Sequence, residues 1–380
     1  MKMQRFTRGL LGPADDHVGS DRLRDESRDD LDLSVIIPAL NEGPNLVLLL
    51  PQLTAVLNSV GVSHEIIVVT KERDERTLKA AADVGARVLV QDSPGYGGAI
   101  VNGIAAGAGQ YVLTMDADLS HPPDFVKDMW SARNGAEITI ASRYVPGGSA
   151  NMSKSRLLLS RVLNTWFGRG LSVPIRDLSS GFRLYRASTL RQLDYRGRDF
   201  DLLQEIVVRA YCEGWRVQEI PFEYMPRRHG SSSARVLRVG RAYAKTFLPL
   251  WKLRNSIEAA DYDDRGFDSP IPLQRFWQRR RYHYATELIN EQGPVLDVGC
   301  GSSRIISALP KGSVALDILI RKLRYARKFA TPVVHGSGYA LPFADASFPC
   351  VLSSEVIEHI PKDCPMIDEL CRVLAPGGRL

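Results

Sequence analysis

The sequence predicts an α/β fold with two mostly parallel sheets, and three observations support this. Short apolar runs alternate with helical segments over residues 33–235, and a second series of the same kind begins at residue 295. Helices that alternate with strands cover the faces of a parallel sheet. A chain of 380 residues, 44% of them hydrophobic, also exceeds the usual size of a single core. We therefore expect two parts, whose ligands lie at the carboxyl ends of their strands.

Individual elements follow from the apolar periodicity. In the first part, we expect strands at residues 33–38, 65–69, 86–90, 111–115 and 136–141. Helices are expected between them, most clearly at residues 45–60, 99–108 and 155–170. In the second part, strands are expected at residues 295–298, 314–317 and 350–353. Residues that directly follow these strands are the candidates for ligand binding.

Composition divides the chain into four segments. Residues 1–31 are polar and lack apolar periodicity, which predicts a disordered leader before a first domain at residues 32–235. Residues 236–290 contain a basic amphipathic helix at Val236–Arg254 and then a linker rich in aspartate and proline, and residues 291–380 form the second domain. The basic helix suits either an anionic membrane surface or a contact between the domains, and the sequence leaves both open.

Charge and cysteine usage restrict the partners and the compartment. The net charge of +6 suits nucleotides, phospholipid surfaces or nucleic acid, but the aromatic residues do not form a stacking platform for nucleic acid. The five cysteines show no C-x-x-C spacing, which favours free thiols in a reducing cytosol. We find no apolar run of roughly 18 to 20 residues and no signal-peptide core. A cytoplasmic chain, peripheral on the cytosolic membrane face, is therefore expected.

Asp116-Ala117-Asp118 directly follows the strand expected at residues 111–115. Its carboxylates should lie at the ligand edge of the sheet, where hard oxygen ligands suit Mg²⁺ or Mn²⁺ and the metal would neutralise a diphosphate leaving group. An isolated pair of this kind would more often cap a helix. The metal site therefore depends on the surrounding motifs.

The surrounding motifs occur in a consistent order, and their residues are Val35-Ile-Ile-Pro38-Ala-Leu40-Asn-Glu42, Gly95-Tyr-Gly-Gly-Ala99, Ala141-Ser-Arg143-Tyr, Asp177-Leu-Ser-Ser-Gly181-Phe-Arg-Leu-Tyr185 and Arg227-Arg-His-Gly-Ser-Ser232. With them the sequence resembles the family 2 glycosyltransferases, in their dolichyl-phosphate mannosyltransferase-like branch. The resemblance implies a GT-A fold, a nucleotide-sugar donor and a polyprenyl or dolichyl phosphate acceptor. Mannose or glucose is the sugar we expect.

The resemblance also implies residue roles. Pro38, Leu40, Glu42 and Ala117 would bind the nucleotide sugar together with Asp116 and Asp118, while Arg143 and Arg227 would contact phosphates. Arg156 and Ser160, one helical turn apart, would hold the acceptor phosphate. Because a lipid phosphate is already anionic, it can attack the anomeric carbon without a general base. A single inverting displacement is therefore expected.

One departure concerns the base of the nucleotide. Relatives of this branch usually carry paired aspartates after the second strand, where this chain has Thr70-Lys71. Asp74 or Glu75 could take over their role. The sequence therefore leaves the nucleotide base open.

A second departure concerns the metal. Many relatives carry glutamine two residues beyond the metal motif, where this chain has Ser120 followed by His121. The ligand set would then include the Ser120 hydroxyl or a water. His121 could also be a ligand, but a loop histidine before Pro122-Pro123 more often has no such role.

The second series carries Val295-Leu-Asp297-Val-Gly299-Cys-Gly301, and Asp317 ends its next strand. Missing side chains and backbone N–H groups let a cofactor approach such a loop closely. With Leu341-Pro-Phe-Ala-Asp-Ala-Ser-Phe348, the series resembles a class I S-adenosylmethionine-dependent methyltransferase. The resemblance implies that Asp297, Gly299, Gly301 and Asp317 bind S-adenosylmethionine. The chain stops where a fifth strand should begin, so we expect an incomplete Rossmann-like methyltransferase domain.

Two other functions remain open. The first domain could transfer sugar to a soluble or polysaccharide acceptor, although the Q-x-x-R-W-like motif common in such enzymes is missing from the sequence. Alternatively, the second domain could be the working methyltransferase and the first a degenerate nucleotide-binding module. The intact pair Asp116 and Asp118 favours sugar transfer.

Overall fold

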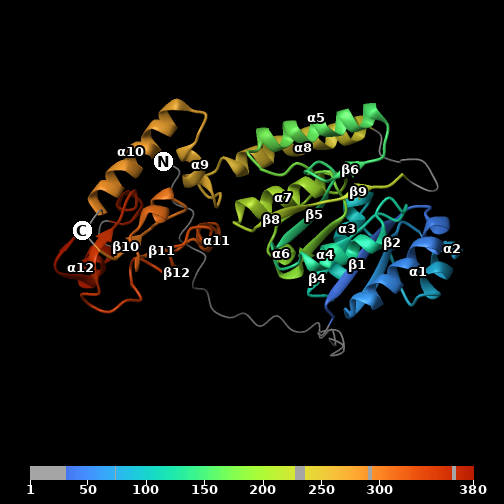
Figure 1. The fold of residues 1–380 in the computed structure, drawn as a ribbon, viewed down its shortest axis with the longest axis horizontal. Helices are drawn as coiled ribbons and strands as arrows, with labels where there is room; N and C mark the ends of the chain where they lie inside the picture. The colour runs from blue at the N-terminus through green and yellow to red at the C-terminus, as the bar shows by residue number, and fades with distance from the viewer. Residues whose placement is uncertain (1–30, 73, 227–235, 290–292, 362–364) are drawn as a thin grey trace.

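The computed structural model describes residues 31–72, 74–226, 236–289, 293–361 and 365–380. The side chains of Arg156 and of residues 236–242 also lie outside the description. The predicted leader, apart from residue 31, and the motif at residues 227–232 are therefore not covered. Two sheets with their helices lie side by side along the long axis of the molecule (Figure 1).

The first sheet has seven strands in the order β3-β2-β1-β4-β7-β5-β8. Their bounds are β1 (Leu33–Ala39), β2 (His64–Thr70), β3 (Arg87–Val90), β4 (Tyr111–Thr114), β5 (Ile138–Ser142), β7 (Arg183–Arg186) and β8 (Val217–Pro221). All five expected strands are formed. β7 is antiparallel to its neighbours β4 and β5, while the other pairs are parallel. A short two-stranded sheet joins β6 (Ser149–Ala150) to β9 (Glu223–Tyr224).

Helices cover both faces of this sheet because side chains of adjacent strand residues point to opposite sides. Val35 and Ile37 pack with α1 (Gly43–Val60), α2 (Glu75–Ala82) and α4 (Val126–Ser131). Ile36, between them, packs with α3 (Gly95–Ala106), α5 (Lys154–Gly170), α7 (Asp201–Cys212) and α8 (Val236–Arg254). The short α6 (Ala187–Arg191) follows β7. The first sheet is thus the middle layer of three.

Helix α1 corrects one expectation. Within the described residues it is the one helix that is long and apolar enough to cross a membrane, so an apolar segment of that length does exist. Eight of its residues are buried, including Leu46, Leu49 and Leu53, which pack against the first sheet. The helix therefore supplies core contacts in this fold.

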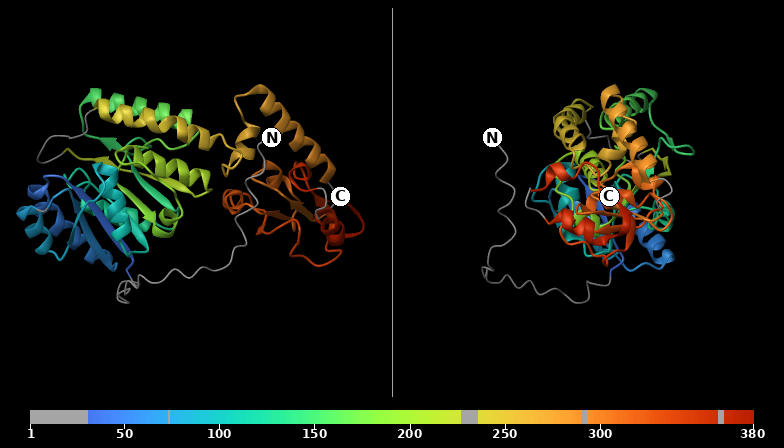
Figure 2. Two further views of the ribbon diagram at one scale, coloured as in Figure 1. Left: turned by 180° about the vertical axis from the view of Figure 1, so that it is seen from behind. Right: turned by 90° about the vertical axis from the view of Figure 1, so that its left-hand side faces the viewer.

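Helices α5 and α8 lie together along one side of the molecule (Figures 1 and 2). The rings of Trp166 and Phe247 stack between them with their centroids 4.5 Å apart. Tyr243 and Leu250, each about one helical turn from Phe247, are buried in the core shared with α7. Helix α8 has the predicted bounds, and it covers the first sheet as part of its outer layer.

The second sheet has five parallel strands in the order β12-β11-β10-β13-β14. Their bounds are β10 (Val295–Val298), β11 (Val314–Asp317), β12 (Val333–His335), β13 (Phe348–Leu352) and β14 (Leu374–Arg379), with helices α11 (Ile320–Ala326) and α12 (Met366–Val373) beside them. The expectation that the chain stops before a fifth strand is wrong, because β14 pairs with β13. The apolar residues of β10, β13 and α12 form a core of their own.

The segment between the two sheets is folded, contrary to the predicted linker. It forms α9 (Tyr262–Phe267) and α10 (Pro272–Ile289). Its aspartates are held by cations on both sides: Asp261 pairs with Arg254, Asp263 with Lys322 and Asp264 with Arg304. Composition suggested a linker because aspartate and proline are common in loops, but ion pairing orders these carboxylates.

A direct contact also joins the two parts. Arg324 of α11 lies over the ring of Trp215, 3.9 Å from its centroid, and donates to Gln192 Oε1 at 2.8 Å. Both of these residues belong to the first part. The two sheets are therefore held together by side-chain contacts as well as by the chain.

Candidate active site

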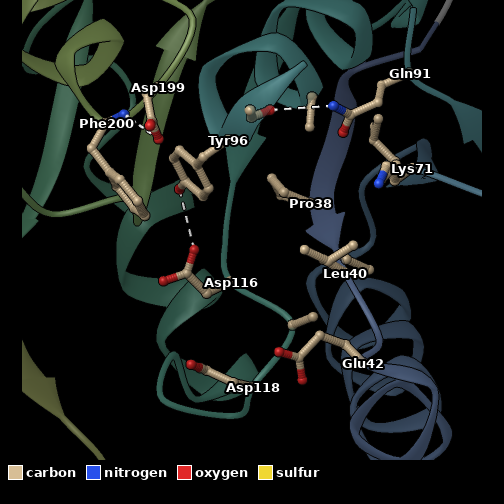
Figure 3. Close-up of a pocket in the computed structure, with 15 residues that line it drawn as sticks. Pro38, Leu40, Glu42, Lys71, Gln91, Tyr96, Asp116, Asp118, Asp199 and Phe200 are labelled. Carbon is tan, nitrogen blue, oxygen red and sulfur yellow. Dashed lines mark hydrogen bonds between the residues drawn. The ribbon is translucent and has the colours of Figure 1, made fainter. Parts of the chain in front are cut away.

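A cavity of about 240 Å³ opens at the carboxyl ends of β1, β2, β3 and β4. Figure 3 shows the residues that line it, which are Pro38, Ala39, Leu40, Glu42, Val69, Lys71, Gln91, Gly95, Tyr96, Ala99, Asp116, Ala117, Asp118, Asp199 and Phe200. All six residues predicted to bind the nucleotide sugar are among them. The parallel topology explains this, because the loop after each strand reaches the same edge of the sheet.

Asp116 is positioned from two sides. Its Oδ1 accepts a hydrogen bond of 3.1 Å from the Tyr96 hydroxyl, and burial followed by the charge of Asp116 raises the pKa of Tyr96 well above its usual value. The backbone N–H of Asp116 donates to His121 Nδ1 at 2.9 Å. The His121 ring is buried and stacks on Phe182. Because His121 Nδ1 accepts this bond and the ring packs in the core, His121 supports the loop from behind.

Asp118 is held by the residue two positions later. Its Oδ1 accepts from both the backbone N–H and the hydroxyl of Ser120, at 3.0 and 2.5 Å. Ser120 is fully buried and does not line the cavity. Leu119 between them has a φ of 63°, a conformation that non-glycine residues rarely adopt. The structure therefore places Ser120 as a support for Asp118, although it was predicted as a metal ligand.

The carboxylates of Asp116 and Asp118 suit a hard divalent cation. Among the described residues there is no cluster of three or more histidine, cysteine, aspartate or glutamate side chains that could enclose a metal. Mg²⁺ is commonly bound through one or two carboxylates together with substrate phosphates and water. Two carboxylates in a cavity fit that mode of binding better than a closed structural site.

The opposite wall of the cavity comes from a distant segment. The rings of Tyr96 and Phe200 stack with their centroids 4.7 Å apart, and Asp199 lies beside them (Figure 3). This wall approaches α3 closely, since a Cβ on Gly97 would lie 2.7 Å from the backbone of Arg198 and Asp199. The motif at residues 95–99 was expected at this site, but no role was predicted for Tyr96, Asp199 or Phe200. The only signal for this contact was the spacing of small residues in α3.

Gly181 explains why the motif at residues 177–185 belongs to this site. A Cβ at Gly181 would lie 2.4 Å from the Tyr96 hydroxyl and 3.5 Å from Asp116 Oδ1. Its carbonyl accepts from Thr114 Oγ1 at 2.7 Å, which holds it against β4. A side chain at this position would displace the hydroxyl that hydrogen-bonds Asp116.

After β2 the cavity presents a cation. Lys71 lines it, whereas Asp74 and Glu75 do not. Asp74 instead caps α2, where its carboxylate accepts from the backbone N–H of Thr77 at 2.9 Å. The side-chain and backbone hydrogen bonds of Thr77 lower the pKa of Asp74. Asp74 is therefore used for folding, and the structure gives no support for its suggested role in base recognition.

Arg143 lies in a buried ion pair and not in the cavity lining. Its Nε and Nη2 donate to the two carboxylate oxygens of Asp177, both at 2.7 Å, and Nη2 also donates to Ser179 at 2.7 Å. Burial alone would raise the pKa of Asp177, but the charge and hydrogen bonds of Arg143 outweigh it and lower the pKa. This arrangement ties β5 to the motif at residues 177–185.

Ser160 belongs to the same hydrogen-bonded network. Its Oγ accepts from the Tyr144 hydroxyl at 2.7 Å, and Asn164 donates to Ser179 at 2.9 Å. Ser160 and Arg143, which were expected to face phosphates, are thus connected through Asn164 and Ser179. A second cavity of about 560 Å³ adjoins this network and is lined by Tyr144, Asn164, Arg161, Arg169 and Arg176. Arg227 and the side chain of Arg156 lie outside the described residues.

The second sheet has its own cavity, of about 600 Å³. Gly299, Gly301 and Asp317 line it, as predicted, together with Glu258, Asp263 and Arg281 from the segment between the sheets. Asp297 does not line it. Burial, partly offset by Arg281, raises the pKa of Asp297 to about 7. The cavity can admit a cofactor, while Asp297 lies behind the glycine-rich loop.

Both parts of the chain match known families. Residues 34–194 match glycosyl transferase family 2, and residues 296–380 match a methyltransferase domain. A solved structure of glucosyl-3-phosphoglycerate synthase from Mycobacterium tuberculosis, bound to Mn²⁺, uridine diphosphate and phosphoglyceric acid, shares 18% identity with a TM-score of 0.47. That comparison covers 60% of this chain and 80% of the other.

Two relatives match at 32% identity. One is dolichol-phosphate mannosyltransferase of Pyrococcus furiosus, over 53% of this chain and 58% of the relative. The other is polyprenol monophosphomannose synthase of Mycolicibacterium smegmatis, over 60% of this chain and 89% of the relative. This chain therefore spans little more than half the length of the Pyrococcus protein but most of the Mycolicibacterium protein. The chain belongs to the family 2 glycosyltransferases and is a glycosyltransferase that also carries a methyltransferase domain.

Proposed function

We propose that the chain transfers a hexose, mannose or glucose, from a nucleotide sugar to a polyprenyl or dolichyl phosphate at the cytosolic face of a membrane. The observation that carries this proposal is the position of Asp116 and Asp118 together in the cavity at the carboxyl edge of the first sheet. The names of the two relatives at 32% identity support a polyprenyl phosphate as the acceptor.

Each group in the cavity has a place in this reaction. Bound Mg²⁺ or Mn²⁺ would offset the charge that develops on the departing diphosphate. Asp116 and Asp118 would hold that ion, and the Tyr96 hydroxyl would fix the orientation of Asp116 by its hydrogen bond. Pro38, Leu40 and Glu42 would contact the nucleoside, and Lys71 would approach it from β2. The acceptor phosphate attacks the anomeric carbon directly, with inversion and without a protein base.

The proposal is tested with the full chain, radiolabelled GDP- and UDP-hexoses, Mn²⁺ and a polyprenyl phosphate. Label should move into the organic phase with one donor, and a chelator should abolish that transfer. A parallel reaction replaces the lipid with soluble phosphate esters and oligosaccharides. Label that stays in the aqueous phase for every donor contradicts the proposal, and transfer to the soluble acceptors alone assigns a different acceptor class.

The membrane contact has support on α5 and α8. Leu158, Val162 and Trp166, which follow one another at four-residue spacing on α5, are 65%, 55% and 49% exposed. On α8, Leu248 and Trp251 are 63% and 45% exposed. Both helices also carry basic residues, including Arg161 and Lys252. An exposed apolar face with basic neighbours is typical of helices that lie on anionic membranes.

The double substitution Leu248→Glu and Trp251→Glu should therefore weaken binding to vesicles that contain phosphatidylglycerol. The expected loss is at least roughly tenfold, because two apolar side chains would no longer enter the lipid and two negative charges are added. Cosedimentation of the full chain measures it. Val47→Glu with Leu78→Glu, on the exposed surfaces of α1 and α2, adds the same charge and serves as the control. If the α8 variant and the control lose vesicle binding to the same extent, α8 has no specific role in membrane binding.

A second activity, methyl transfer, is favoured by the cavity of the second sheet. Its glycine-rich loop and Asp317 would bind S-adenosylmethionine, and the match to a methyltransferase domain supports this. Titration of the full chain with S-adenosylmethionine in a calorimeter tests it. Heat of binding that disappears on replacing Asp317 by Ala is expected, and no heat with the unchanged chain contradicts it.

A further inference from the structure

We propose that α10 is a second membrane-contact helix, which seats the second part of the chain on the same anionic lipid surface as α5 and α8. This inference deepens the proposed function and rests on its membrane contact. The observations behind it concern α10, however, and not α5 or α8, so an experiment can contradict the inference and leave the proposed function standing.

One face of α10 presents apolar and aromatic side chains to solvent. Leu273, Trp277 and Tyr284 are 77%, 57% and 50% exposed, and Phe276 and Leu288 beside them are 62% and 47% exposed. Residues 273, 277, 280, 284 and 288 follow the spacing of a single helical stripe. Large side chains of this kind are normally buried in a core, so a stripe of them marks a contact surface.

The charge of the helix indicates what that surface contacts. The helix carries four arginines and a single glutamate. Arg280, within the stripe, lies over the Tyr284 ring at 4.6 Å. Arg279, outside the stripe, lies over Phe267 at 5.3 Å and pairs with Asp268 at 3.3 Å. Arginine stems can cover apolar surface while the guanidinium groups reach anionic headgroups. Arg280 and the aromatic side chains share one helical face, a combination that suits an anionic lipid surface.

The position of α10 agrees with that partner. Figures 1 and 2 show α5, α8 and α10 on the same side of the molecule, beyond the two sheets. The angle between α8 and the segment that leads to α10 is fixed, because Arg254 at the end of α8 is 1% exposed and pairs with Asp261. Arg254 also donates to the carbonyls of Leu171 and Ser172, at the end of α5. These contacts hold the end of α5, the end of α8 and the start of the segment that leads to α10 together.

Helix α10 also forms part of the second cavity. Gln278 and Arg281 line that cavity, whereas Trp277 and Arg280 beside them belong to the exposed face. A helix that lies on lipid through one face and lines a cavity with the next would hold the cavity at the level of the headgroups. The substrate that enters it would then be a lipid-borne molecule or one gathered at the membrane.

The test compares cosedimentation of the full chain with vesicles of phosphatidylcholine alone and of phosphatidylcholine with phosphatidylglycerol. Leu273→Glu with Trp277→Glu should weaken binding to the mixed vesicles at least roughly tenfold. Arg280→Glu should weaken binding to the mixed vesicles alone. The matched control is again Val47→Glu with Leu78→Glu, which should bind as the unchanged chain does.

A second measurement does not depend on loss of binding. In a chain with Cys364→Ser and Cys371→Ser, Leu273→Cys is labelled with an environment-sensitive fluorophore, whose emission should shift to the blue on mixed vesicles. An emission spectrum that stays unchanged on mixed vesicles overturns the inference. Vesicle binding by the α10 variants at the level of the unchanged chain overturns it too. If the α8 variant loses vesicle binding in that same assay, the proposed function is kept without the inference. If the α8 variant binds normally and the α10 variants do not, α10 is the contact and the role of α8 fails. An α10 variant that only converts a dimer into a monomer assigns this face to a second copy of the chain and also overturns the inference.

Discussion

Asp118→Asn is expected to lower metal-dependent hexosyl transfer roughly 10²–10³-fold, the size of effect seen when one charge-stabilising group is removed from an active site. Asp118 is 2% exposed, and its Oδ1 accepts two hydrogen bonds from Ser120. An amide oxygen can accept the same two bonds, so the loop keeps its shape while the negative charge is lost. The rate of label transfer into lipid, measured over a range of Mn²⁺ concentrations, gives the result.

The control is Asp124→Asn, whose side chain is 83% exposed and pairs with Lys127 at the surface. It makes the same chemical change outside the cavity and should leave transfer unchanged. Unfolding temperatures of both variants should match that of the unchanged chain. An Asp118→Asn chain that transfers sugar at the normal rate would remove the metal role from this carboxylate and contradict the proposed mechanism.

Asp177→Ala is expected to destabilise the fold by about 3–5 kcal/mol, because it leaves the guanidinium of Arg143 buried without its carboxylate. Asp177 is fully buried, and the Arg143 side chain is 11% exposed. The folded-state pKa of Asp177 is lowered from its ordinary value of 3.8. The stability that the ionised Asp177 contributes is therefore fully present above pH 3.8. It is lost as the pH falls through the lowered pKa of the folded state. Urea unfolding at pH 7 and in acid measures both effects.

Asp194→Ala is the matched control, since that carboxylate pairs with Arg196 but is 68% exposed. Exposed ion pairs contribute little, so its urea midpoint should hardly move. The free energy of unfolding of Asp177→Ala is compared with that of the unchanged chain. If the difference between the two does not become smaller below pH 3, the ion pair is not its source.

Much of the site could be predicted because its parts are local in the sequence. The apolar periods locate β1 and β4, and in a parallel sheet the residues that follow them, Leu40 and Asp116, must meet at one edge. Phe200 could not be found in this way, since it reaches the cavity by stacking on Tyr96, about a hundred residues earlier. Such a contact has no period along the chain.

Buried charge was the other obstacle. β7 was missed because Arg183 begins it, although the guanidinium is fully buried and donates to the carbonyls of Leu178, Ser180 and Leu203. Arg143 was predicted to contact a phosphate for a related reason: the sequence does not show that Asp177 pairs with it. A charged residue in a sequence suggests a ligand, but its partner in the fold decides whether it can reach one.

The three aspartates between the sheets give the molecule a stiff joint. Asp261 pairs with Arg254 at the end of α8, Asp263 accepts from the backbone N–H of Ser302 at 3.0 Å, and Asp264 pairs with Arg304. Within four residues the joint therefore grips the end of α8 and the loop beside the second cavity. A tilt of α8 would therefore move that loop as well. Cleavage of the chain within this joint would leave buried charged groups without their partners on both fragments.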